Sequence, residues 1–427
     1  MILNSNKEKI IFYKFPIFLF SLIPFFLITG PFLSDLSISL ISLIFILYCF
    51  KNKNFSYFKN KYFYFFLVFW IYLIFNSLFN NFNLDSFKIS LFFFRYGVFV
   101  VAIVQLLDED HKFIKNFFYC ILFCFVALIL DGFYQYFAGE NIFGWKSSER
   151  ISSFFGEEEI LGSYIVRLWP IFFGLSIILN KKKNYFFYFF ILIFILSEVL
   201  IFLSGDRSAF FYINLSAIFV ILFSKKLLKL RLLTLSSSVI LLVIISFINP
   251  SAKERVFDHT MNQMNLSKGQ INLLSDQNES EELYIFSKQH THHYITAYKM
   301  FLDNKIFGVG VKKFRKLCSD ERYIESELSC SSHPHNSYIQ ILSETGIIGF
   351  LFLIITLIYF LGYLFKHSIL RTRGKYFFSD FEVCILSGIA IYLWPFIPTG
   401  NVFNNWLTIA TILNFPFLIW SIKLKKT

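Results

Sequence analysis

Charged residues, glycine and proline are all scarce in this chain. Only 16% of its 427 residues are Asp, Glu, Lys or Arg, it contains 18 Gly and 9 Pro, and 56% of its residues are apolar. A soluble chain of this length would form two or three domains with many more surface charges. The composition excludes that class and indicates a single body embedded in a membrane. Phenylalanine is so abundant, at 62 residues, that a single Phe carries little information.

The chain also lacks the features that nucleic-acid and nucleotide binding require. Its net charge is +12, yet it has neither a basic stripe on a folded soluble domain nor a phosphate-binding loop for a nucleotide. Residues 248–337 contain equal numbers of basic and acidic side chains, so the positive excess lies in short segments between apolar runs. We therefore expect no nucleic acid among its partners.

Twelve apolar runs reach or approach the length of about 20 residues that an α-helix needs to cross a bilayer. They lie at residues 12–30, 33–50, 62–79, 86–107, 113–137, 161–179, 185–204, 208–223, 232–248, 338–365, 381–398 and 406–421. This pattern predicts an all-α polytopic membrane protein with about 12 transmembrane helices.

The runs divide the chain into three parts. Residues 1–247 contain nine predicted helices, residues 248–337 form one large and partly helical loop, and residues 338–427 contain three more helices. The first run has no small-residue cleavage site and is followed by a second, so we expect it to be retained.

Basic residues between the runs predict the orientation, because they accumulate on the cytoplasmic side of a membrane. Clusters such as the lysines at 181–183 all fall on one face if both termini are cytoplasmic. The opposite loops at 31–33, 80–85 and 399–405 contain no basic residue. The large loop at 248–337 is then periplasmic, and the protein lies in a bacterial inner membrane.

The six cysteines fall into two groups. Four of them lie in apolar runs, where a buried small hydrophobic residue is the ordinary interpretation; they are Cys49, Cys120, Cys124 and Cys384. Cys318 and Cys330 are together in the large loop, twelve residues apart. If that loop is periplasmic, a disulfide between them is favoured.

The most informative stretch runs from His333 to Gly349, where the large loop returns to the membrane. Pro334 ends the segment before it, and Asn336 or the serine that follows can cap a new helix. His335 is thereby placed at a helix N-terminus, whose positive end disfavours the imidazolium and keeps the ring able to accept a proton. His335 is therefore a candidate general base.

Six of the eight histidines lie in the large loop, at 259, 290, 292, 293, 333 and 335. A polar loop attracts histidines, and this plain explanation is favoured for His259, His292 and His293. His290 is a candidate substrate contact. No carboxylate stands at a recognised zinc spacing, so we expect no metal ion and no other cofactor.

Arg207 stands in a short outer turn, where the charge rule disfavours a cation. A guanidinium at such a place can hold phosphate oxygens in a fork, although an interfacial arginine paired with Asp206 is the alternative. Arg255, just after the ninth run, and Arg150, in an outer segment, are further candidates for phosphate contacts or are solvated charges.

Several apolar runs contain ionisable residues, which lipid penalises by about 3 kcal/mol each on insertion scales; Arg95, Asp131, Arg167 and Glu198 are among them. We expect them to face protein or a polar cavity. Arg95 and Arg167 are candidate substrate contacts, and pairing of the four with one another is the alternative.

These motifs resemble those of the O-antigen ligase and O-antigen polymerase superfamily. The superfamily signature is His, then Asn or a similar residue, nine residues, Gly, two residues and Gly. This sequence matches it with His335, Asn336, Gly346 and Gly349. An arginine in a small-residue turn and a Gly-x-Gly turn before the signature also agree. The ligase pattern has Leu four residues after that arginine, where this chain has Phe211.

The resemblance implies a membrane glycosyltransferase that uses an undecaprenyl diphosphate-linked glycan. His335 resembles the catalytic histidine of the family, and Arg207 its diphosphate-binding arginine. A second arginine of the family's large loop has no secure counterpart; Arg255 is the first candidate and Arg315 the next. The acceptor would be the lipid A core or another glycan, and the carrier lipid would approach from the membrane.

Two activities of the same chemistry remain open. A ligase transfers the finished O-antigen to the lipid A core, whereas a polymerase joins repeat units on the same carrier. A flippase for the lipid-linked glycan would need ionisable residues along a path across the membrane, but the candidates here gather at the outer face. A purely structural membrane protein does not explain the complete signature.

Overall fold

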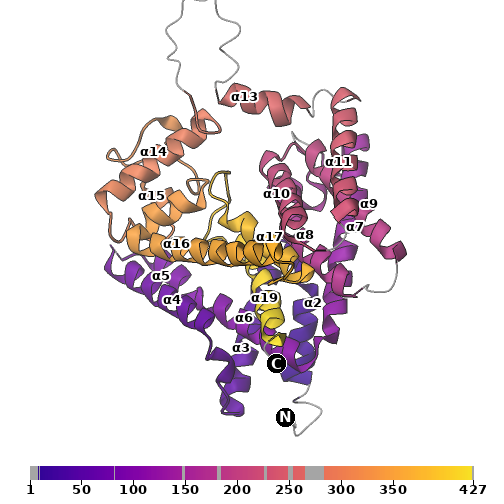
Figure 1. Ribbon diagram of the computed structural model, residues 1–427. Coiled ribbons are helices and arrows are strands. Elements are labelled where there is room, and N and C mark those ends of the chain that lie inside the picture. The colour runs from indigo at the N-terminus through magenta and orange to yellow at the C-terminus, as the bar shows by residue number, and fades with distance from the viewer. Residues whose placement is uncertain are drawn as a thin grey trace, which may run out of the picture.

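The structure of the protein, a computed structural model, is helical throughout (Figure 1). It describes Glu8 and residues 10–80, 82–146, 150–179, 184–225, 228–248, 253–264 and 283–425. Within these ranges the one β feature is an isolated antiparallel bridge between Glu140 and Lys146. The predicted all-α class is therefore confirmed.

Helices overlie all twelve apolar runs. In the N-terminal half they are η1 (Ile10–Lys14), α2 (Phe15–Ile28), α3 (Pro31–Lys51), α4 (Lys61–Phe79), α5 (Leu84–Phe92), α6 (Phe94–Glu109), α7 (Ile114–Ala138), α8 (Leu161–Leu179), α9 (Asn184–Leu203), α10 (Arg207–Phe223) and α11 (Leu228–Ile248). In the C-terminal part they are α16 (Ser337–Thr372), α17 (Asp380–Leu393), α18 (Asn405–Ile412) and α19 (Asn414–Leu424). Short 3₁₀ turns, η2 (Ser56–Phe58), η3 (His111–Phe113) and η4 (Ser153–Glu158), lie between them.

Eight of these described helices or helix pairs are long and apolar enough to cross a membrane. Three further apolar helices are shorter, at Tyr188–Leu203, Arg207–Phe223 and Thr234–Phe247, and α17 has only 14 residues. The chain is thus a multi-pass membrane protein, while the expected count of twelve spans is not confirmed. Local signals define several helix starts, because the side chains of Asn60, Asn83 and Asp206 accept backbone N–H groups in the first turns of α4, α5 and α10.

Helix α8 is the centre of the body and packs against α7, α10 and α17. The rings of Phe172 on α8 and Phe118 on α7 stack with their centroids 5.2 Å apart. At Gly174 a Cβ would lie 3.1 Å from the Cβ of Cys384 on α17, so a glycine here permits close approach of the two helices. Such packing is what holds membrane helices together, because lipid is as apolar as the side chains it contacts.

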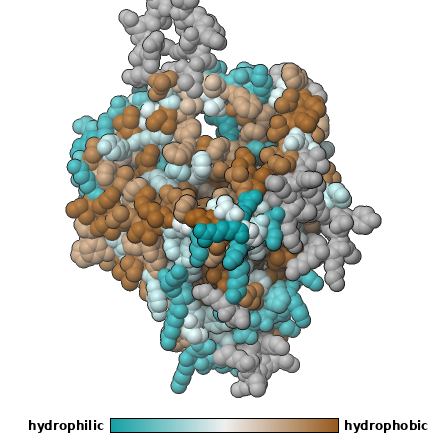
Figure 2. Space-filling model, in the orientation of Figure 1, coloured by the Kyte–Doolittle hydropathy of each residue, from teal (hydrophilic) through white to brown (hydrophobic). Residues whose placement is uncertain are grey.

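The outer surface is strongly apolar. Figure 2 shows broad areas of hydrophobic residues over the face in view. On α16, Leu351, Ile355 and Ile358 leave 48, 50 and 63% of their surface exposed. Exposed apolar area of this extent on helices of spanning length is a lipid-facing surface.

Arg95 was a candidate substrate contact, but the structure gives it structural partners. Its Nη2 donates to Asp35 Oδ1 of α3 at 2.6 Å, and its guanidinium lies 4.5 Å above the ring of Tyr96. Asp131 likewise accepts hydrogen bonds from Ser153 Oγ and the Ile142 N–H, at 2.5 and 3.0 Å. The expected pairing of Arg95, Asp131, Arg167 and Glu198 with one another is absent among the described contacts; each has other neighbours.

The large loop forms a small unit that covers the outer ends of the helices. It comprises η5 (Glu254–Asp258), α13 (His259–Gln263), α14 (Lys288–Asp303), α15 (Phe314–Leu317) and η7 (Glu327–Ser329); Figure 1 shows α14 and α15 beside α16, with α13 near α11. Residues 265–282 of the loop lie outside the described residues. The expectation of a partly helical loop is confirmed for the described part.

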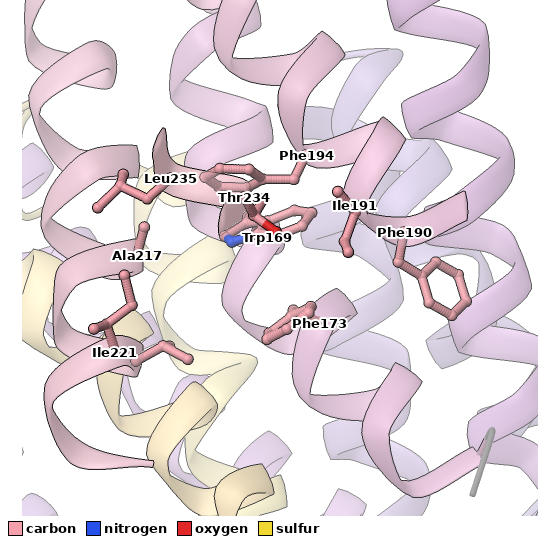
Figure 3. A pocket seen from close by; sticks show the side chains of 10 residues that line it. Trp169, Phe173, Phe190, Ile191, Phe194, Ala217, Ile221, Thr234 and Leu235 are labelled. Atoms are coloured by element: carbon pink, nitrogen blue, oxygen red, sulfur yellow. The ribbon is translucent and has the colours of Figure 1, made fainter. Parts of the chain in front are cut away.

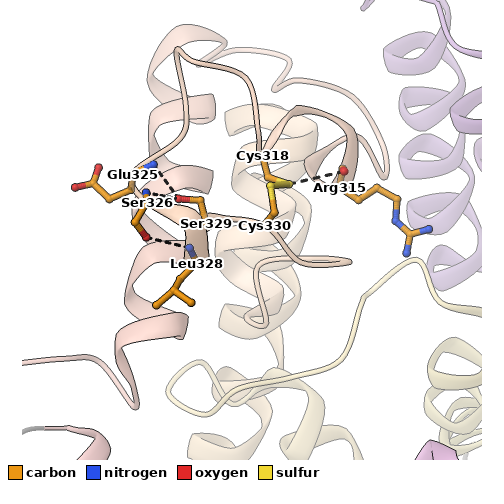
Figure 4. The surroundings of a disulfide bond; sticks show 7 residues. All are labelled: Arg315, Cys318, Glu325, Ser326, Leu328, Ser329 and Cys330. Carbon is orange, nitrogen blue, oxygen red and sulfur yellow. Dashed lines mark hydrogen bonds between the residues drawn. A yellow bond between two sulfur atoms is a disulfide. The ribbon is translucent and has the colours of Figure 1, made fainter.

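A disulfide joins Cys318 to Cys330, the pair expected from the sequence, with a Cα–Cα distance of 5.1 Å (Figure 4). Cys318 is buried in a small core with Ala297 and Met300 of α14 and with Phe314 of α15. The bond ties α15 to the segment that leads directly to the signature histidines. It thereby constrains where that segment leaves the loop.

Gly346 interrupts α16 at the place where the Gly-x-Gly turn of the loop, residues 308–310, packs against this helix. Its φ is +63° and its ψ −169°, which breaks the helix nine residues after Ser337. The Val309 N–H donates to Ser343 O at 2.8 Å, and the Gly310 N–H donates to Glu344 O at 2.9 Å. A Cβ on Gly346 would lie 2.3 Å from Ile306 O, so only glycine fits. The tenth apolar run is therefore two helices, a short outer one and a long spanning one.

Gly346→Ala is expected to lower the free energy of unfolding by roughly 3 kcal/mol, because alanine disfavours this positive φ and its Cβ would clash with the backbone of the loop. Gly362→Ala on the same helix is the control, because no atom lies within 4 Å of its Cβ position. It should be neutral or stabilising by about 1 kcal/mol. Thermal unfolding in detergent measures both, and equal midpoints for the two variants would contradict the role of Gly346.

Candidate functional site

The segment between the disulfide and α16 presents His335 in an unusual backbone conformation. His335 has a φ of +57°, in the left-handed region where histidine is tolerated better than most residues. Its carbonyl accepts the Thr399 N–H at 2.8 Å. Asn336 caps α16, because its side-chain oxygen accepts the N–H groups of Tyr338 and Ile339. The predicted cap is therefore confirmed.

Three histidine rings from two parts of the loop surround His335. The centroid of its ring lies 4.1 Å from that of His333, 5.3 Å from that of His293 and 5.4 Å from that of His290. His290 and His293 come from one face of α14, three residues apart. His333 and His335 stand just before α16, far from the α14 pair in the sequence. The cluster therefore depends on α14 packing against the start of α16.

Hydrogen bonds hold two of these rings in place. The Nε2 of His333 donates to Thr399 O at 3.0 Å, and its Nδ1 lies 2.8 Å from Ser332 Oγ. Ser287 Oγ accepts the backbone N–H of His290 at 3.2 Å and lies 2.7 Å from the Nδ1 of the same residue. The Nε2 of His335 lies 2.9 Å from Ser331 Oγ.

Burial keeps the cluster uncharged. The pKa of His335 falls to about 3, mainly through burial and in smaller part through the neighbouring rings of His333, His290 and His293. The pKa of His333 and that of His290 both fall to about 4, again mainly through burial. The sequence predicted a neutral His335 because of the helix end. The direction agrees, but loss of water and repulsion by adjacent rings are the causes.

Arg207 lies at the edge of this cluster. It is half-buried at the start of α10, where its Nη1 donates to Thr260 Oγ1 at 3.1 Å and to Gln263 Oε1 at 2.9 Å. Its positive charge contributes to lowering the pKa of His290. The alternative partner, Asp206, instead caps α10 by accepting the Ala209 N–H. Arg207 therefore has neutral partners, and no carboxylate of the described residues forms an ion pair with it.

Arg150 and Arg315 add positive charge on either side. Arg150 acts electrostatically on Arg207, although its Nε is also 3.7 Å from Glu159 Oε2. Arg315 acts on His333 from the opposite side, and Figure 4 shows its guanidinium pointing away from the disulfide. The first candidate for a second loop arginine, Arg255, falls in η5, but its side chain lies outside the described residues.

Sequence reasoning missed Glu344, a completely buried carboxylate in the signature stretch. It accepts the Phe314 N–H at 3.2 Å and the amide of Gln340 at 3.1 Å. Gln340 in turn donates to Asn401 Oδ1 at 2.9 Å. This network ties the backbone next to Arg315 to the short outer helix of α16. The sequence signal that could have identified Glu344 is an acidic residue within an otherwise apolar run.

Two other candidates have defined surroundings. Asn336, which the signature also makes a candidate substrate contact, donates through its amide to Pro395 O at 2.8 Å in addition to capping α16. These bonds hold the start of α16 in place. Arg167 lies deeper, in α8, away from the exposed cations. Among the described residues no three His, Cys, Asp or Glu side chains are arranged to hold a metal ion.

The geometry agrees with a comparison against known families. Residues 188–354 match the family model described as O-Antigen ligase. The match extends from α9 to the first half of α16, and it includes Arg207, the disulfide, the histidine cluster and Gly346. A search of curated proteins found no match.

The buried histidines predict how stability depends on pH. Their pKa values are lower in the folded than in the unfolded chain, where histidine titrates near pH 6.5, so the unfolded state binds more protons as the pH falls. The unfolding midpoint should therefore decrease steadily between pH 6.5 and 4. His333→Gln should reduce this dependence of the unfolding midpoint on pH, whereas His111→Gln, at an exposed residue of η3, should leave it unchanged. A midpoint independent of pH would contradict neutral burial.

Proposed function

We propose that this chain, which belongs to the O-antigen ligase superfamily through its residues 188–354, transfers a glycan from undecaprenyl diphosphate to a sugar hydroxyl of the lipid A core. The observation that carries the proposal is a neutral His335 in a cluster whose other rings lie near arginines, with Arg207 acting on His290 and Arg315 acting on His333. A base beside a diphosphate site is what this transfer requires.

His335 takes the proton of the acceptor hydroxyl as that oxygen attacks the anomeric carbon of the donor. Its low pKa in the free protein keeps the ring neutral and ready to accept a proton. A low pKa also makes a weak base. Binding of the diphosphate places negative charge near the cluster, which favours the imidazolium and raises the pKa of His335. The donor thus strengthens the base that acts on its acceptor.

The diphosphate is the leaving group, and cations stabilise the charge that it gains. Arg207 suits this role because its present partners, Thr260 and Gln263, are neutral hydroxyl and amide groups that a phosphate can displace. Arg315 is exposed, and its guanidinium forms no ion pair with any described carboxylate. Arg150 extends the same positive surface. Since the leaving group departs as a diphosphate, the transfer needs no activating nucleotide.

A hollow between α8, α9, α10 and α11 suits the polyprenyl chain of the carrier (Figure 3). It is lined mainly by aromatic and aliphatic side chains, among them Trp169, Phe194 and Ala217. Ala217 lies ten residues after Arg207 on α10, which corresponds to about 15 Å along the helix axis. A lipid tail in the hollow would therefore lie beneath a diphosphate held at Arg207.

The orientation follows from the distribution of basic residues. Both termini lie in the cytoplasm, and the histidine cluster faces the periplasm of a bacterial inner membrane. The disulfide is consistent with that compartment. Transfer then takes place in lipopolysaccharide biosynthesis, after the lipid-linked glycan has crossed the membrane.

His335→Ala and Arg207→Ala should each abolish glycan attachment while leaving expression and insertion intact. The control is His292→Ala, because His292 is on α14 but bonds outward to Ser326 at 2.7 Å. The measurement is lipopolysaccharide analysis of a deletion strain complemented with each variant. A core without O-antigen, with carrier-linked polymer accumulating, supports ligation. A core bearing a single repeat unit would assign polymerisation instead, and parental transfer by either variant would refute its role.

Ala217→Trp should fill the hollow and raise KM for the lipid-linked donor about ten-fold with little change in kcat, because the tail contributes uniform binding. Ile218→Trp is the matched control, since the side chain of Ile218, next to Ala217 in the sequence, is 45% exposed on the lipid side. Transfer kinetics in reconstituted membranes compare the two. Equal KM values would place the carrier chain elsewhere.

A further inference from the structure

We propose that Arg167, Tyr212 and Tyr294 form a second, deeper site that binds a phosphate group carried on a lipid. The inference rests on the proposed function, because it assigns an additional anion site to the same substrate class. The three residues come from α8, α10 and α14, and nothing in the motif analysis placed them together.

Arg167 is a buried cation without a counter-ion. Only 6% of its surface is exposed, and no described carboxylate forms an ion pair with it. Its Nη1 donates to Ser163 O at 3.1 Å and to the hydroxyl of the same serine. Its guanidinium also lies 5.4 Å above the ring of Tyr392. These neutral groups leave the Nε of Arg167 without a partner.

The two tyrosine hydroxyls are also buried without a hydrogen-bond partner. Tyr212 is 2% exposed and Tyr294 is 7% exposed. Helices α8 and α10 pack closely here, since a Cβ on Gly162 of α8 would lie 2.8 Å from the Cβ of Ala209 on α10. Arg167 and Tyr212 follow these two residues by five and three positions, and Arg167 acts electrostatically on Tyr212, as Tyr212 does on Tyr294. The ring of Tyr294 lies 6.3 Å from that of His290, so it borders the histidine cluster.

Unpaired buried polar groups are rare, because each loses its bonds to water without replacement. Arg95 shows how the same body satisfies an arginine that is only structural. It has a carboxylate at 2.6 Å, a backbone carbonyl at 2.7 Å and a tyrosine hydroxyl at 3.0 Å. Arg167 has no such carboxylate, so its charge calls for an anion from outside the chain.

The chemistry of Arg167, Tyr212 and Tyr294 identifies the class of that anion. A guanidinium and two phenolic hydroxyls are all hydrogen-bond donors, which suit the several oxygens of a phosphate. Arg167 is six residues into α8, about 9 Å below the outer end of the helix. A phosphate at this depth must be carried on a lipid. The source is the diphosphate of the polyprenyl carrier or the head group of a phospholipid.

The test measures thermal unfolding of the full chain in nanodiscs with added undecaprenyl diphosphate or phosphatidylglycerol. Without probe, Arg167→Met should unfold at the same or a higher temperature than the wild type, because it removes an unpaired charge. Arg95→Met, the matched control, should unfold at a lower temperature. With probe, the wild type and Arg95→Met should be stabilised, whereas Arg167→Met should bind about ten-fold more weakly or worse. Tyr212→Phe should show a smaller loss.

Stabilisation by undecaprenyl diphosphate alone assigns the site to the carrier. Stabilisation by phosphatidylglycerol that also requires Arg167 assigns it to a lipid head group. If Arg167→Met unfolds early as Arg95→Met does and binds both probes normally, Arg167 is structural and the inference is wrong. The transfer assay on His335→Ala tests the proposed function separately, so either can fail without the other.

Discussion

The backbone contact between the turn at 308–310 and Gly346 is the interaction on which the outer face of this protein depends. Two glycines with positive φ let the loop lie directly on the point where α16 breaks. Because the peptide groups themselves are in contact, the position of the loop is determined without any flexible side chain. The short outer helix, its cap at Asn336 and the left-handed His335 all follow from that docking.

The docking also explains the state of the histidines. Packing of α14 against the start of α16 removes water from four rings and places them within 4.1 to 6.2 Å of one another. Burial and mutual repulsion keep all of them neutral, and the positive charges of Arg207 and Arg315 act in the same direction. The result is a site that is positive at its edges and uncharged at its centre, which matches a charged leaving group beside a neutral acceptor hydroxyl.

Glu344 and Arg167 show two opposite solutions to a buried charge. Glu344 is satisfied by backbone N–H and amide donors, and it connects the loop to the signature helix. Arg167 retains an unpaired nitrogen beside two unpaired hydroxyls. A fully satisfied charge specifies one structure, whereas an unsatisfied one is a cost that a ligand can remove. The first belongs to the scaffold, and the second is the basis for a deeper phosphate site.

The sequence by itself determined the helical membrane body, because long apolar runs leave a backbone in lipid no alternative to helices. It also determined the cap at Asn336 and the pair Cys318 and Cys330, since each depends on residues close together in the chain. Only the tertiary structure decided that His290 and His293 join His335, that Arg95 is neutralised by Asp35, and that Glu344 supports the segment carrying Arg315. These contacts unite helices far apart in the sequence, and a nearly uniform apolar pattern does not encode which helices become neighbours.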